Sequence, residues 1–105
     1  MLIGYGRVST LDQDLSVQNE LLRQAGCEKV FEEKLTGIDR KRPQLTHMLK
    51  ELKEGDTLII TSLDRLARST HDLLEITKTL QQENINFRSL REPWADTTNP
   101  MGSFL

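Results

Sequence analysis

An arginine and a serine stand two residues apart at the end of a strand-like segment, residues 2–9, where they could act together on a phosphate. Side chains alternate across a strand, so one face is expected to carry Ile3, Tyr5, Arg7 and Ser9. A hydroxyl beside a guanidinium has the form of a nucleophile with a cationic partner. Solvated polar residues at a sheet edge would follow the same pattern, so this segment alone leaves both interpretations open.

A second charged group occurs far along the chain, in the segment Leu-Asp-Arg-Leu-Ala-Arg at residues 63–68. If this segment is helical, Arg65 and Arg68 lie three apart on one face, with Asp64 one turn before Arg68. A surface ion pair worth a few tenths of a kcal/mol is the alternative explanation. Arg42, in a basic stretch, is a further candidate.

These residue types favour chemistry at phosphorus. Guanidinium groups match phosphate oxygens bidentately and keep their charge at any working pH. A phosphodiester under attack gathers negative charge that preplaced cations stabilise, and a serine hydroxyl needs such help to act as a nucleophile. The candidate set therefore suits attack on a phosphodiester better than attack on an amide: Ser9, Arg7, Arg42, Arg65 and Arg68.

Length and composition limit the class of protein. The 105 residues predict one small domain, and the net charge of −2 argues against a simple basic coat for nucleic acid. The single Cys27 excludes an internal disulfide framework and a thiolate zinc site. His47 and His71 are isolated, and no carboxylate–histidine ligand set for a metal appears. No signal peptide or membrane span is recognisable, which predicts a cytoplasmic protein.

Four strands are expected, at residues 2–9, 29–33, 56–61 and 85–90, with a mobile loop at 34–41. The first predicted helix ends at Gly26, and its apolar spacing is set by Val17, Leu21, Leu22 and Ala25. The next begins at Pro43, ends at Gly55, and has an apolar stripe formed by Leu45, Met48, Leu49 and Leu52.

A third helix should begin after Ser69, which forms a capping box with Asp72, and should run to Asn84. Its helical spacing comes from Leu73, Leu74, Ile76 and Leu80. Alternating strands and helices predict an α/β domain with a mostly parallel central sheet flanked by helices. Sites in such sheets gather at the carboxyl ends of the strands, so Ser9 and Asp64 could meet in space.

The motifs Tyr-Gly-Arg-Val-Ser-Thr at 5–10 and Leu-Asp-Arg-Leu-Ala-Arg at 63–68 resemble those of the serine recombinase family of DNA resolvases and invertases. Gln13, Gln18, the segment 87–90 and the segment 96–102 fit the same pattern. The resemblance covers essentially the whole chain. It implies a three-layer, resolvase-like catalytic domain over residues 1–105.

The resemblance also implies roles for individual residues. Ser9 would attack a DNA phosphodiester, giving a 5′-phosphoserine linkage and a free 3′-hydroxyl, without ATP or a metal. Arg7, Arg65 and Arg68 would hold the scissile phosphate, and Arg42 would approach it from a mobile loop. Asp64 would orient arginines or assist proton transfer. The expected substrate-binding residues are Tyr5, Gln13, Gln18 and Thr36.

Family members continue through a long helix that forms the dimer interface, and usually carry a helix-turn-helix domain. The 105 residues stop where that helix should begin, so the fragment alone is expected to be inactive. Double-stranded DNA, a homodimer and a synaptic tetramer are the partners implied for the full-length protein.

Two other interpretations remain: a non-catalytic α/β dimerisation, signalling or nucleotide-binding module, and a degenerate recombinase domain. Thr10 to Gln13 supply no glycine-rich phosphate loop, which counts against a nucleotide-binding module. The retained Ser9 and arginines count against the degenerate domain. The sequence leaves resolvase, invertase and transposon recombinase undistinguished.

Overall fold

A sheet of parallel strands forms the centre of the protein. The computed structural model describes residues 1–9, 15–35, 43–67 and 69–92, with the backbone alone at 8, 9, 15 and 35. Within these ranges the strand order is β2-β1-β3-β4, and every pairing is parallel. The elements are β1 (Leu2–Ser9), α1 (Leu15–Gln24), β2 (Lys29–Leu35), α2 (Pro43–Glu51), β3 (Thr57–Ile60), α3 (Leu63–Leu66), α4 (Thr70–Gln82) and β4 (Asn86–Ser89).

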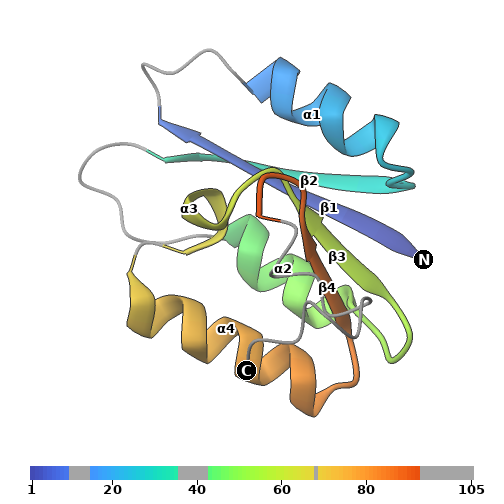
Figure 1. The fold of residues 1–105 in the computed structure, drawn as a ribbon, viewed down its shortest axis with the longest axis vertical. Helices are drawn as coiled ribbons and strands as arrows, with labels where there is room; N and C mark the ends of the chain where they lie inside the picture. Colours follow the sequence, from blue (N-terminus) through green and yellow to red (C-terminus); the bar gives the residue numbers. More distant parts are fainter. Residues whose placement is uncertain (10–14, 36–42, 68, 93–105) are drawn as a thin grey trace.

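Helices cover both faces of this sheet (Figure 1). α1 lies on one face, and α2 and α4 lie on the other, which gives three layers. This arrangement confirms the predicted α/β fold with a central parallel sheet. No helix in the described ranges combines the length and apolar character that crossing a bilayer requires.

The order of the strands gives the sheet a topological switch point. The chain passes from β1 outward to β2, then crosses back to β3 on the other side of β1 and continues to β4. The crossover direction therefore reverses between β1 and β3. In open α/β sheets, ligands bind outside the carboxyl ends of the strands at such a switch point. β1 ends at Ser9, and the chain after β3 leads directly into α3.

β1 packs differently on its two faces, as its alternation predicts. Ile3 and Tyr5 are buried in the main core against the layer that contains α2 and α4. Gly4 faces α1, where an added Cβ would lie 3.0 Å from Cys27 Sγ and 3.1 Å from Leu22 Cδ1. Glycine therefore lets α1 approach the sheet closely. Burial raises the pKa of the Cys27 thiol to about 11, so this thiol is protonated at neutral pH.

Local signals for the ends of helices are confirmed at two places. Gly26, just after α1, has φ of +100°, a conformation that costs glycine little. Ser69 caps α4, because its side chain accepts a hydrogen bond of 3.1 Å from the amide of Asp72. Each of these short-range interactions is encoded within a few residues of sequence.

Several predicted boundaries were wrong. β2 extends to Leu35 rather than residue 33, because parallel pairing with β1 continues through Ser9 and Leu35. α2 ends at Glu51 before reaching Gly55, and α4 ends at Gln82 before Asn84, which adopts a φ of 57°. β3 and β4 are shorter than predicted, at four residues each.

Three apolar residues of the predicted helical patterns are exposed rather than buried: Val17, Leu21 and Leu74. On α1 the buried positions are Leu22 and the polar Gln18. Gln18 is tolerated there because its amide forms hydrogen bonds with the backbone of β1. Spacing alone therefore misjudged which residues of α1 face the sheet.

Candidate active site

Two arginines hold the end of β1 and the short helix α3 together. The Arg7 guanidinium donates a hydrogen bond to the backbone carbonyl of Asp64. In the reverse direction, Arg65 Nη1 donates to the backbone carbonyl of Arg7 at 3.2 Å. Each side chain therefore fixes the backbone next to the other. This reciprocal contact confirms that the two distant charged groups meet at the carboxyl edge of the sheet.

Gln18 supports the backbone of Arg7 from α1. Its Oε1 accepts from the Arg7 amide at 3.2 Å, and its Nε2 donates to the Arg7 carbonyl at 3.1 Å. The pairing of β3 with β1 ends at Tyr5, so the ladder between these two strands does not reach the backbone of Arg7. The Gln18 amide thus replaces a missing strand. Since Gln18 is buried, this position supports a role in positioning Arg7 rather than the predicted contact with substrate.

Asp64 is exposed and remains a carboxylate at neutral pH. The hydroxyl of Ser62 donates to Asp64 Oδ1, and this hydrogen bond, together with the charges of Arg65 and Arg91, lowers the pKa of the carboxyl below its usual value. A carboxylate with a lowered pKa is a weak proton acceptor. The lowered pKa therefore counts against the proton-transfer role for Asp64.

The helix at residues 63–68 is shorter than predicted, and Arg68 lies outside the described residues. α3 ends at Leu66, and Ala67 has an extended backbone with φ of −125° and ψ of 150°. A pocket of about 210 Å³ opens beside this bend, between α3 and the start of α4, and Asp64 and Ser69 lie on its wall.

Tyr5 lies inside the protein and not at its surface. Its side chain is 0% exposed, and its hydroxyl donates to Glu33 Oε1 at 3.2 Å. Glu33, also buried, accepts hydrogen bonds from the first turn of α2 as well: from the amides of Gln44 at 3.2 Å and Leu45 at 3.1 Å. This burial differs from the predicted role of Tyr5 in substrate binding. Tyr5 and Glu33 instead link β1, β2 and α2.

Replacing Glu33 by alanine should lower the free energy of unfolding by about 3 kcal/mol, because each buried donor left without an acceptor costs about 1–3 kcal/mol. Glu33→Gln, which keeps a carbonyl acceptor, should lose less. Urea unfolding of the protein measures both values. Glu32→Ala is the matched control, since Glu32 is an exposed neighbour on the same strand, and it should change stability by less than about 1 kcal/mol. Equal unfolding midpoints for Glu33→Ala and Glu32→Ala would contradict this assignment.

The remaining predicted site residues lie largely outside the described part of the chain. Gln13, Thr36, Arg42 and Arg68 fall in segments that the structure does not describe. For Ser9 the structure gives the backbone, which ends β1 two residues beyond Arg7 and is paired in register with Leu35. The roles of these residues remain predictions.

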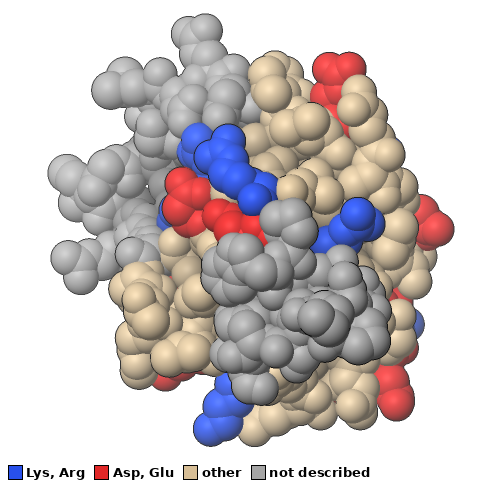
Figure 2. Space-filling model, viewed as in Figure 1, with Lys and Arg blue, Asp and Glu red and all other residues tan. Residues whose placement is uncertain are grey.

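Sequence reasoning missed three residues that shape this region: Glu33, Ser62 and Glu92. Glu33 follows Phe31 by two residues in β2, so strand alternation could have indicated that a carboxylate faces the core. The partner of Ser62, Asp64, is only two residues away. Glu92 carried no comparable signal, because its partner depends on how α3 and the end of β4 come together. Figure 2 shows basic and acidic side chains in direct contact in the area where Figure 1 places α3 and the end of β4.

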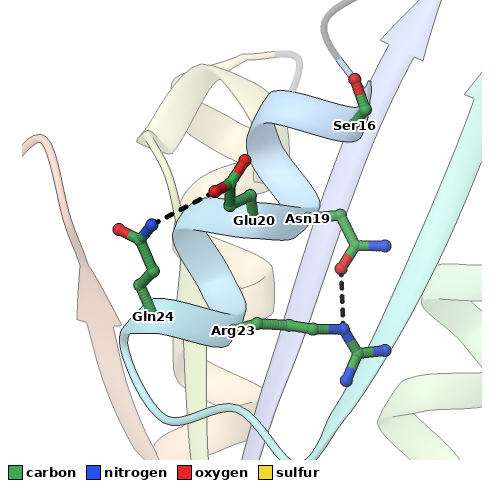
Figure 3. Close-up of a pocket in the computed structure, with 5 residues that line it drawn as sticks. All are labelled: Ser16, Asn19, Glu20, Arg23 and Gln24. Carbon is green, nitrogen blue, oxygen red and sulfur yellow. Dashed lines mark hydrogen bonds between the residues drawn. The ribbon is translucent and has the colours of Figure 1, made fainter.

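A second pocket lies on α1 and lacks the features of this site (Figure 3). It is lined by Ser16, Asn19, Glu20, Arg23 and Gln24. Its side chains are paired along the helix: Arg23 Nε donates to Asn19 Oδ1 at 3.1 Å, and Gln24 Nε2 donates to Glu20 Oε1 at 3.4 Å. Such exposed pairs one helical turn apart are ordinary surface interactions. The arginine pair at the end of β1 is therefore the better candidate site.

The fold and this site define a parallel α/β domain with the guanidinium groups of Arg7 and Arg65 at the switch point of its sheet. The chain matches the family described as "Resolvase, N terminal domain" over residues 2–105. It belongs to that family.

Relatives of known name agree with this assignment. The chain is 50% identical over 104 residues to the serine recombinase gin of Escherichia phage Mu, covering 99% of this chain and 53% of that protein. It is 44% identical over 104 residues to the transposon Tn917 resolvase of Enterococcus faecalis, covering 99% of this chain and 55% of that protein. The chain thus spans about half the length of the curated relatives it matches.

A solved structure shows the same fold. A resolvase family site-specific recombinase from Streptococcus pneumoniae superposes with a TM-score of 0.70 at 22% sequence identity, covering 93% of this chain and 76% of that chain.

Proposed function

We propose that this chain is the catalytic domain of a site-specific DNA recombinase of the resolvase and invertase type, which cuts and rejoins DNA through a covalent serine–DNA intermediate. The proposal is carried by the Arg7 and Arg65 guanidinium groups, which are held together beside the end of the strand that carries Ser9. The names of the relatives, a serine recombinase and a resolvase, support it.

In this mechanism Ser9 Oγ attacks the phosphorus of a DNA phosphodiester. A new Oγ–P bond forms, the bond from phosphorus to the 3′-oxygen breaks, and that oxygen leaves with a proton as a 3′-hydroxyl. Arg7 and Arg65 stabilise the negative charge on the non-bridging oxygens. The phosphoserine ester keeps the energy of the broken bond, so attack by a 3′-hydroxyl reseals DNA without ATP.

The other site residues have supporting roles in the proposal. We assign the orientation of the arginines to Asp64 on the family resemblance. Gln18 positions the Arg7 backbone, and Tyr5 supports β1 from the core through its hydrogen bond to Glu33. We assign phosphate or substrate contacts to Arg68, Arg42, Gln13 and Thr36 on the family resemblance.

The proposal extends to the larger assembly. The curated relatives are about twice as long, which supports a full-length protein with further segments for dimerisation and DNA recognition. We propose double-stranded DNA as the substrate, a homodimer that pairs into a synaptic tetramer, and a cytoplasmic site of action.

Trapping the covalent intermediate tests this function. Duplexes selected for binding by the full-length protein are synthesised with a bridging 3′-sulfur at candidate bonds, because the released 3′-thiol reseals poorly and the adduct accumulates. After proteolysis, mass spectrometry should find DNA joined through its 5′-phosphate to the peptide that contains Ser9. Linkage through a 3′-phosphate or to another residue would overturn the mechanism, and so would the absence of any adduct.

A further inference from the structure

The helix that carries Asp64 and Arg65 donates a hydrogen bond from its first amide to a residue just beyond a distant strand. α3 is only four residues long, and its N-cap residue, Ser62, makes no side-chain capping bond. The Ser62 hydroxyl is instead directed to the carboxylate of Asp64. The first amide of α3, that of Leu63, is bonded by an acceptor from elsewhere in the fold.

Glu92, just beyond the end of β4, supplies that acceptor. Its Oε1 accepts a hydrogen bond of 3.0 Å from the amide of Leu63. The same oxygen accepts from the hydroxyl of Ser89, which is buried. The Ser89 hydroxyl oxygen in turn accepts from the Glu92 amide at 3.4 Å. Ser89 thus fixes the carboxylate so that it faces α3.

The backbone reinforces this connection between β4 and α3. Backbone hydrogen bonds continue where β3 and β4 end. The amide of Leu90 donates to the Ile60 carbonyl at 2.9 Å, and the amide of Arg91 donates to the Thr61 carbonyl at 2.9 Å. The end of β4 therefore runs beside the chain that leads into α3. Glu92 closes this contact one residue later, at the first turn of the helix.

If Leu63 moved, the next two residues, Asp64 and Arg65, would move with it, and both belong to the candidate active site. The carbonyl of the next residue, Asp64, accepts a hydrogen bond from the Arg7 guanidinium. The side chain of the residue after it, Arg65, donates to the Arg7 carbonyl. Misplacing catalytic groups by about 1 Å can cost about 100-fold in rate. A short helix has few interactions of its own to resist such a shift.

We infer that Glu92 is a positioning residue of this enzyme: by holding the start of α3 against β4, it sets the geometry of the Arg7–Arg65 pair. The inference rests on the proposed function. Glu92 takes no part in the contacts between Arg7 and Arg65, so its effect passes through α3. It is only half-buried, and its removal leaves the apolar core intact.

The test compares Glu92→Ala with Glu92→Gln in the full-length protein. Glu92→Ala should slow formation of the Ser9–DNA adduct by about 10- to 100-fold in single turnovers, with DNA affinity changed less than about 2-fold. Glu92→Gln keeps a carbonyl oxygen for Leu63 and should recover most of the rate. Glu54→Ala, an exposed acidic position in the turn before β3, is the control and should react like wild type.

A structural measurement separates this inference from the proposed function. In Glu92→Ala, the Leu63 amide should exchange its hydrogen faster, and the Nε–H resonances of Arg7 and Arg65 should shift, whereas Glu54→Ala should leave all three unchanged. If wild type forms no Ser9 adduct, the proposed function fails, and these resonances still decide the role of Glu92. The inference would be overturned if the resonances were unchanged in Glu92→Ala or if this variant formed the adduct at the wild-type rate. It would also be overturned if Glu92→Gln lost as much of the rate of adduct formation as Glu92→Ala.

Discussion

Replacing Ser9 with alanine should abolish the covalent protein–DNA adduct and leave DNA binding intact. The reaction requires an oxygen that can bond to phosphorus, and alanine has none. The substitution removes one oxygen atom at the end of a strand whose backbone pairing with β2 is unchanged, so the fold should persist. Denaturing electrophoresis of end-labelled DNA measures the adduct, and gel retardation measures binding.

Thr10→Ala is the matched control for this experiment, because it removes the neighbouring hydroxyl in the sequence. This variant should still form the adduct. If Ser9→Ala formed the adduct at the wild-type level, Ser9 would not be the nucleophile. The same conclusion would follow if only Thr10→Ala lost the adduct. A Ser9→Ala protein that no longer binds DNA would contradict the expectation that Ser9 acts in the chemical step alone.

Replacing Arg7 or Arg65 with alanine should each slow adduct formation by about 100- to 1,000-fold, the usual cost of losing one donor to a developing oxyanion. Arg7→Lys should recover little of this rate, since an ammonium cannot reproduce the planar fork of a guanidinium. Single-turnover rates with excess protein measure the chemical step separately from binding.

The reciprocal contact between the two arginines predicts that their effects on the rate are coupled. Because each guanidinium fixes the backbone beside the other, the loss in the double variant should be smaller than the product of the two single losses. Arg23→Ala controls for a general loss of positive charge, because the Arg23 side chain is hydrogen-bonded to Asn19 on α1 and not to a residue of the candidate site. The rate of this variant should stay within about 2-fold of wild type. Independent, multiplicative losses would contradict the coupling.

Local signals in the sequence predicted local structure well. The strand at residues 2–9 was found in full, since its alternation reports which face is buried. The cap formed by Ser69 was found because it depends on a residue only three positions away. The convergence of Arg7 with Asp64 and Arg65 followed from the rule that parallel strands carry sites at their carboxyl ends.

Predictions that required knowledge of packing were less successful. Val17 and Leu21 have helical spacing yet are exposed, while the polar Gln18 is buried because β1 extends beyond the end of β3. The short α3 depends on how β3 leads into it, so its end at Leu66 could not be judged from the spacing of its residues.

The sequence by itself determined the class of fold, the family, and the residue types at the end of β1, because each depends on patterns along the chain. Only the tertiary structure decided how those residues are held. The Tyr5–Glu33 link, the support of Arg7 by Gln18, and the hydrogen bond from the first amide of α3 to Glu92 each join residues distant in sequence. Such pairs leave no periodic signal, since the folding of the whole sheet is what brings the partners within hydrogen-bonding distance.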